Sequence, residues 1–78
     1  MEREKSGESI EKAIIVESIA AEYEYLERKF GERGKNWELD TQSLVKKGNK
    51  YYDRIDLKLS DGTRKTIYFD ITAFFGKR

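Results

Sequence analysis

The sequence of 78 residues contains no cysteine and no histidine. Without cysteine the chain can form no disulfide, no thiolate metal site and no cysteine nucleophile. Without histidine it lacks the commonest general base and the commonest protein ligand of zinc. Enzymes that depend on these side chains are therefore excluded, and we expect no cofactor.

An excess of one charge and long apolar runs are also missing. Sixteen basic against fifteen acidic side chains leave a net charge of +1, so no overall field favours nucleic acid or anionic lipid. The chain begins Met-Glu-Arg-Glu-Lys, and no apolar stretch matches a signal peptide or a membrane span. We expect a cytoplasmic protein without membrane contact, folded as a single domain over residues 1–78 with a flexible arm at residues 1–7.

The clearest pattern is a β-hairpin within residues 51–75, because apolar and polar side chains alternate on both of its strands. One face should pack on a core and the other should meet solvent or a partner. A three-residue loop at residues 60–62 pairs Ile55 with Ile67 and keeps the apolar side chains on one face. A two-residue Asp61-Gly62 loop would mix the faces. We therefore predict the three-residue loop.

A helix is predicted over residues 9–30, with Ser6 or Ser9 as the N-cap and Gly31 at the end. Residues 37–46 then alternate as a strand. The order helix, strand, strand, strand predicts an α+β fold in which an N-terminal helix packs on a three-stranded antiparallel β-meander, αβββ, in two layers. The predicted core consists of Ile15, Ile19, Leu26, Leu39, Ile55, Leu57, Ile67, Phe69 and Ile71.

The turn at residues 47–49 decides which side of the first strand faces the helix. A two-residue Gly48-Asn49 loop would point Trp37, Leu39 and Val45 away from the helix. A three-residue loop brings them inward, although it sets Asp40 opposite Asp56. We favour the three-residue loop, because burial of two large apolar side chains is worth several kcal/mol at roughly 25 cal/mol per Å².

The hairpin resembles the core of the PD-(D/E)xK nuclease superfamily, in particular its small resolvase-like members. The matching residues are Ile55-Asp56-Leu57, Asp61-Gly62 and Tyr68-Phe69-Asp70-Ile71-Thr72. The resemblance implies that Asp56 and Asp70 would be acids of a Mg²⁺ site and that Glu22 would be the helix glutamate. Thr72 stands where the family has its lysine, and the sequence holds no counterpart of the family's later helix and strand. We therefore expect no catalysis.

Two acidic residues fall on apolar faces. Glu22 lies inside the apolar stripe of the predicted helix, and Asp53 lies on the inward side of its strand. A buried carboxylate must be paired, hydrogen-bonded or protonated. These residues either form a two-acid site with shifted pKa values or reach satisfying partners at the rim of the core.

The outer face of the sheet is the predicted binding face, because no second helix covers it. Aromatic and basic side chains gather there, and aromatic and arginine side chains anchor many interfaces. Its residues are Tyr52, Arg54, Lys58, Tyr68 and Phe74. We predict a non-catalytic domain that binds a protein partner or forms a homodimer through this face. The alternatives are a nucleic-acid-binding module, such as a degenerate nuclease-like domain, and a Mg²⁺-dependent nuclease that uses Asp56 and Asp70.

Overall fold

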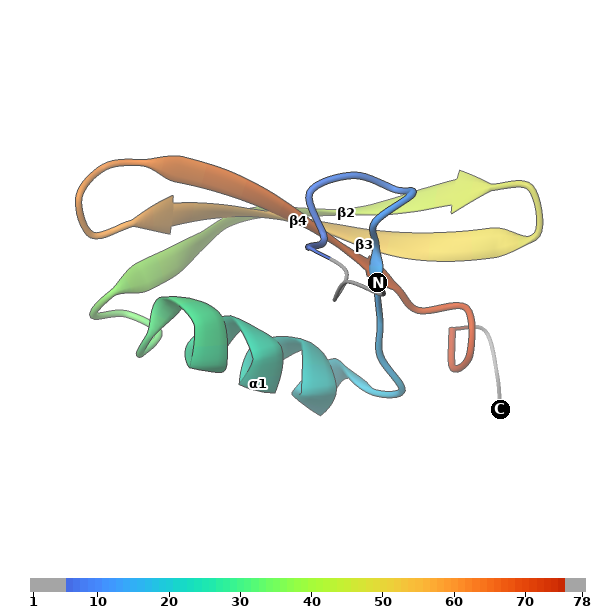
Figure 1. Ribbon diagram of the computed structural model, residues 1–78, viewed down its shortest axis with the longest axis horizontal. Helices are drawn as coiled ribbons and strands as arrows, with labels where there is room; N and C mark the ends of the chain where they lie inside the picture. Colours follow the sequence, from blue (N-terminus) through green and yellow to red (C-terminus); the bar gives the residue numbers. More distant parts are fainter. Residues whose placement is uncertain (1–5, 76–78) are drawn as a thin grey trace, which may run out of the picture.

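The sheet has four strands, and a helix covers one of its faces. A computed structural model describes residues 6–75, with β1 (Ile14–Ile15), α1 (Ile19–Phe30), β2 (Trp37–Lys47), β3 (Lys50–Leu59) and β4 (Arg64–Asp70) in chain order. The strands lie in the order β1-β4-β3-β2; β2, β3 and β4 are antiparallel, and β1 is parallel to β4. Figure 1 shows α1 on one side of the sheet and the loop before β1 on the other. The α+β class is confirmed, but the predicted three-stranded sheet lacked β1.

The helix is shorter than predicted, because residues 9–18 are not helical. α1 begins after Ser18, whose backbone is extended and whose hydroxyl accepts a hydrogen bond from the Ala21 N–H at 3.1 Å. Residues 14–16 are all β-branched, which favours extended backbone. This segment pairs with the edge of β4. Pairing at the sheet edge therefore outweighs the helical periodicity of residues 9–18.

The segment before β1 is held against β4 by Gly7. Residues 1–5 of the predicted flexible arm lie outside the described residues, whereas the Gly7 carbonyl accepts a hydrogen bond from the Tyr68 N–H at 2.7 Å. Gly7 has a φ of 77°, and a Cβ there would lie 2.8 Å from Ile14 Cδ1 and 2.9 Å from Ile67 Cγ2. The close approach of this segment to β4 therefore requires glycine at position 7.

We expect Gly7→Ala to destabilise the fold by about 1–3 kcal/mol, since it combines a strained φ with two close contacts. Urea unfolding measures the loss, and amide hydrogen exchange should become faster at Tyr68. Gly34→Ala is the matched control, because Gly34 has a similar φ of 84° with no atom within 4 Å of the added Cβ. Equal losses in the two variants would contradict the docking role of Gly7.

The core lies between α1 and the inner face of the sheet. Its members include Leu26, Ile55, Leu57, Ile67, Phe69 and Ile71, as predicted, together with Trp37. Ile15 and Ile19 were predicted to be buried, but they are 66% and 50% exposed. Ile15 lies on the edge strand β1 and Ile19 is the first residue of α1, so neither faces the core. No helix within residues 6–75 is long and apolar enough to cross a membrane.

The hairpin between β3 and β4 has the predicted register. Ile55 lies opposite Ile67, and the Leu59 N–H donates to the Thr63 carbonyl at 2.7 Å, which closes the three-residue loop. Arg54 also lies opposite Tyr68. The alternation of apolar residues was therefore sufficient to predict this pairing.

The turn between β2 and β3 has two residues, not the predicted three. Lys47 pairs with Lys50, and Gly48 has a φ of 61°, as the first position of a type II′ turn requires. The register shifts by one at Asp40, so Leu39 still lies opposite Leu57 as predicted. This bulge buries Trp37 and separates Asp40 from Asp56. It also leaves Val45 on the outer face, where it was not expected.

Candidate functional site

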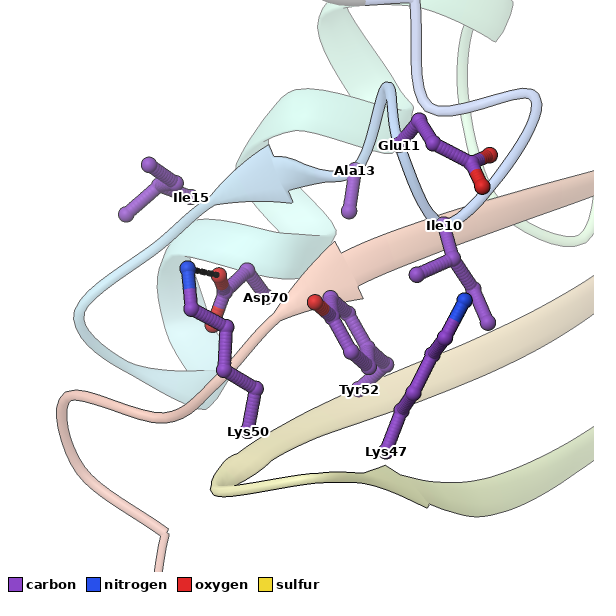
Figure 2. A pocket seen from close by; sticks show the side chains of 8 residues that line it. All are labelled: Ile10, Glu11, Ala13, Ile15, Lys47, Lys50, Tyr52 and Asp70. Carbon is purple, nitrogen blue, oxygen red and sulfur yellow. Dashed lines mark ion pairs between the residues drawn. The ribbon is translucent and has the colours of Figure 1, made fainter.

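A pocket of about 480 Å³ lies between the loop before β1 and the outer face of the sheet. Tyr52 is on its floor and is only 7% exposed, because Ile10 and Ala13 pass over it. Figure 2 shows the Tyr52 ring between Lys47 on one side and Lys50 with Asp70 on the other. The N-terminal segment therefore builds the pocket by covering part of the predicted binding face.

Both ammonium groups of this pocket have a carboxylate nearby. Lys50 Nζ lies 3.9 Å from Asp70 Oδ2. The pKa of Glu11 is lowered by a backbone hydrogen bond, by the Ser9 hydroxyl and by the charge of Lys47. A site for an anion concentrates positive charge, whereas here charges of both signs alternate. The pocket thus offers paired charges around an aromatic ring and no strong preference for a ligand of one sign.

The structure does not bring the five predicted binding residues onto one surface. Tyr52 is covered, and Phe74 packs against the inner core. Arg54 and Lys58 are exposed, and Tyr68 is half-buried on the outer face. The Arg54 guanidinium contacts Asp56, with 3.4 Å between Nε and Oδ1. The N-terminal segment, which was predicted to be helical, covers Tyr52, and the turn after β4 directs Phe74 toward the core.

The two acids that the nuclease resemblance singled out share the outer face but lie far apart on it. Asp56 is opposite Thr66, and Asp70 is opposite Tyr52. Four residue positions along the strands separate them, about 13 Å at 3.3 Å per residue. Carboxylate ligands of one Mg²⁺ lie about 2.0–2.1 Å from the ion. Asp56 and Asp70 therefore do not form one metal site in this arrangement.

Each of these acids is held by its own partners. Asp56 accepts hydrogen bonds from the hydroxyls of Thr41 at 2.6 Å and Thr66 at 2.5 Å, and these lower its pKa. Asp70 accepts from the Thr72 N–H at 3.0 Å. Thr72, in the place of the family's lysine, accepts from the Tyr51 N–H at 2.9 Å. Glu22 lies on the other side of the sheet, and residues 6–75 contain no group of three or more potential metal-ligating side chains.

Glu22 and Asp53 lie between α1 and β3, so the structure places the two acids together, which is one of the two alternatives that the sequence left open. Glu22 is 0% exposed and Asp53 is 5% exposed. The Nε2 group of Gln42 donates to Asp53 Oδ2 at 2.8 Å. Neither carboxyl oxygen of Glu22 has a hydrogen-bond donor beside it. Two buried carboxyl groups therefore lie together, and the Gln42 amide donates to Asp53 and not to Glu22.

The pair can hold a proton. Burial, then the hydrogen bond to Asp53 and the charge of Asp53, together raise the pKa of Glu22 to about 8. A protonated Glu22 becomes a donor, so it can hydrogen-bond to the Asp53 carboxylate and satisfy both groups. This hydrogen bond explains why an acidic residue lies on the apolar face of α1, and the explanation needs no bound ligand.

The free edge of β2 is a second candidate. Among the strands of residues 6–75, β2 pairs only with β3, and the loop before it covers the other side at Trp37, where the Gly34 N–H donates to the Trp37 carbonyl at 2.7 Å. Beyond the bulge at Asp40, no described strand pairs with this edge. Residues 41–44 are exposed, and Leu44 is 53% exposed. The sequence did not single out this edge, because the predicted three-residue turn places Leu44 on the outer face, whereas the observed turn places it on the helix side, opposite Asp53.

The backbone of this edge has hydrogen-bonding groups that point outward. In an antiparallel ladder, hydrogen-bonded and non-hydrogen-bonded pairs alternate. Counting from the closing pair Lys47–Lys50, the N–H and C=O of Gln42, Leu44 and Lys46 point away from β3.

Comparison of the chain with protein-family models, curated proteins and solved structures finds no match.

Proposed function

We propose that this chain is a small, non-catalytic protein-binding domain that pairs the free edge of β2 with an extended segment of its partner. The observation that carries the proposal is the regular edge at residues 41–47, which lies between the bulge and the turn with outward-facing backbone groups. Unpaired edges accept an added strand, and backbone hydrogen bonds supply much of the affinity.

The side chains of this edge favour contact over repulsion. Natural proteins protect open edges with charged residues, proline or bulges. Residues 41–45 carry no charge and no proline, and the bulge lies before them at Asp40. The exposed cations Arg54 and Lys58 of the predicted binding face lie on the neighbouring strand and are available to a partner that crosses from the edge onto this face.

The lack of catalysis is proposed from the chemistry of the acids. The carboxylates of Asp56 and Asp70 are engaged by threonine hydroxyls and a backbone N–H. The chain has no histidine or cysteine to serve as base or nucleophile. We therefore propose that both carboxylates have a structural role and take no part in catalysis.

Selection from a library of displayed random peptides tests the edge, with NMR amide shifts as the map of the bound site. We expect selected peptides to shift the amides of Gln42, Leu44 and Lys46 most. Leu44→Pro should abolish binding, because it removes an outward N–H without breaking the ladder to β3. Leu44→Ala keeps that N–H and should bind within about threefold of wild type, since main-chain bonds dominate strand addition. Shifts confined to α1 or to the pocket would contradict the proposal.

A further inference from the structure

We infer that the partner at this edge is a second copy of the chain, which pairs β2 with β2 in antiparallel orientation about a two-fold axis at Leu44. This inference rests on the proposed function and names the partner of the same site. Residues 41–47 form a segment with Leu44 at its centre, so a two-fold axis there uses the whole of the regular edge.

The side chains match across this axis. Directly opposed residues of an antiparallel pair point to the same face. On the helix side, Leu44 meets Leu44 of the second copy and Gln42 meets Lys46. On the outer side, Ser43 meets Val45 and Thr41 meets Lys47. Leu44, an exposed apolar side chain in the isolated chain, would thereby gain an apolar neighbour.

Charge decides the orientation of the pairing. The first part of β2 carries Glu38 and Asp40, and the last part carries Lys46 and Lys47. Antiparallel pairing brings the basic end of each copy toward the acidic end of the other. Parallel pairing would place the lysines of both copies side by side, and like charges in opposed positions are destabilising.

The geometry also closes the assembly at two copies. A two-fold interface uses the same surface on both subunits, so each β2 edge is consumed once. On the opposite edge of the meander, β1 and Gly7 pair with residues 68–70 of β4, so only the short stretch at residues 64–67 is left without a described partner. A single sheet of two copies results, and the described chain offers no second long open edge for a fibre to grow from.

Sedimentation equilibrium tests the inference with charge variants at exposed positions. We expect a reversible dimer of twice the 9.2 kDa chain mass with a Kd in the micromolar to millimolar range, as is usual for small interfaces. Thr41→Lys should raise the Kd about five- to tenfold, because it sets two lysine pairs across the axis. Adding Lys47→Glu to that variant should return the Kd to near the wild-type value, since each pair then becomes Lys–Glu.

Two outcomes would overturn the inference. One is a wild-type chain that stays monomeric at about 1 mM, which corresponds to less than about 4 kcal/mol of association free energy. The other is a dimer whose Kd is unchanged by Thr41→Lys. If a monomeric chain still selects peptides that shift the Leu44 amide, only the second copy fails as partner. If no selected peptide reaches the edge either, the proposed function fails with it.

Discussion

Raising the pH from 5 to 9 is expected to lower the free energy of unfolding by on the order of 4 kcal/mol. In the folded chain the pKa of Glu22 is raised from 4.5 to about 8, and each pKa unit corresponds to about 1.36 kcal/mol. Between these values the folded chain keeps a proton that the unfolded chain has released, so stability falls as the pH rises. Below about 4.5 both states are protonated and above about 8 both are charged, so the contribution levels off at each end.

Urea unfolding at a series of pH values measures this slope, and one isosteric variant isolates its cause. Glu22→Gln should remove most of the slope, because an amide does not titrate and its NH₂ can donate to the Asp53 carboxylate. Glu24→Gln is the matched control, since Glu24 is exposed on the same helix and its replacement should leave the slope in place. An equally steep slope in the Glu22→Gln variant would show that another group carries the proton.

Phe69→Ala is expected to destabilise the fold by about 3–5 kcal/mol, enough to unfold much of the protein at room temperature, since domains of this size are stable by only about 5–10 kcal/mol. Phe69 is 0% exposed near the end of β4, and its ring packs edge-to-face with Tyr25 of α1, with 5.7 Å between centroids. Its loss would leave a cavity where the helix docks on the sheet, and the neighbouring side chains refill such cavities only in part.

Thermal unfolding followed by circular dichroism measures this effect, with Ile19→Ala as the control. Ile19 is 50% exposed, so its truncation should cost less than about 1 kcal/mol. Comparable losses in the two variants would show that the core has been misplaced and that the helical stripe predicted from the sequence was correct.

The sequence was most informative where alternation could be checked on two strands at once. Ile55, Leu57 and Leu59 on one strand, with Ile67 and Phe69 on the next, permit only one loop length that keeps both apolar faces together. The inward positions of Glu22 and Asp53 followed from the same kind of pattern. Their inward-facing positions could therefore be predicted, but the choice between a two-acid pair and separate partners at the rim depended on the donors around Glu22, which the sequence does not show.

The sequence was misleading where two patterns compete for the same residues. Residues 9–18 have helical spacing, but the β-branched run at residues 14–16 finds a partner only once β4 exists at the sheet edge. Rules that consider only neighbouring residues cannot decide between a helix and an edge strand for this segment. The coverage of Tyr52, and with it the pocket, is a consequence of that choice.

The bulge at Asp40 could not be read from residue types either. The predicted turn and the observed turn differ by one residue, and the bulge compensates for that difference so that Trp37 and Leu39 stay inside. The bulge also relieves the Asp40–Asp56 opposition that the predicted register carried, because Thr41 takes the place beside Asp56. The register of residues 41–47 follows from the two-residue turn, and the bulge restores the predicted pairing only for residues 37–39.

Pairing of β2 with β2 of a second copy can be measured directly with a cysteine introduced at Leu44. The chain has no cysteine of its own, so any disulfide in Leu44→Cys joins two copies at this position. Opposed residues across an antiparallel pair have Cβ atoms about 4.5–5.5 Å apart, close to the 3.5–4.5 Å of a disulfide. We expect Leu44→Cys to form a covalent dimer under mild oxidation much faster than Glu24→Cys, whose site lies on the exposed face of α1. Equal rates of cross-linking at the two positions would contradict the pairing.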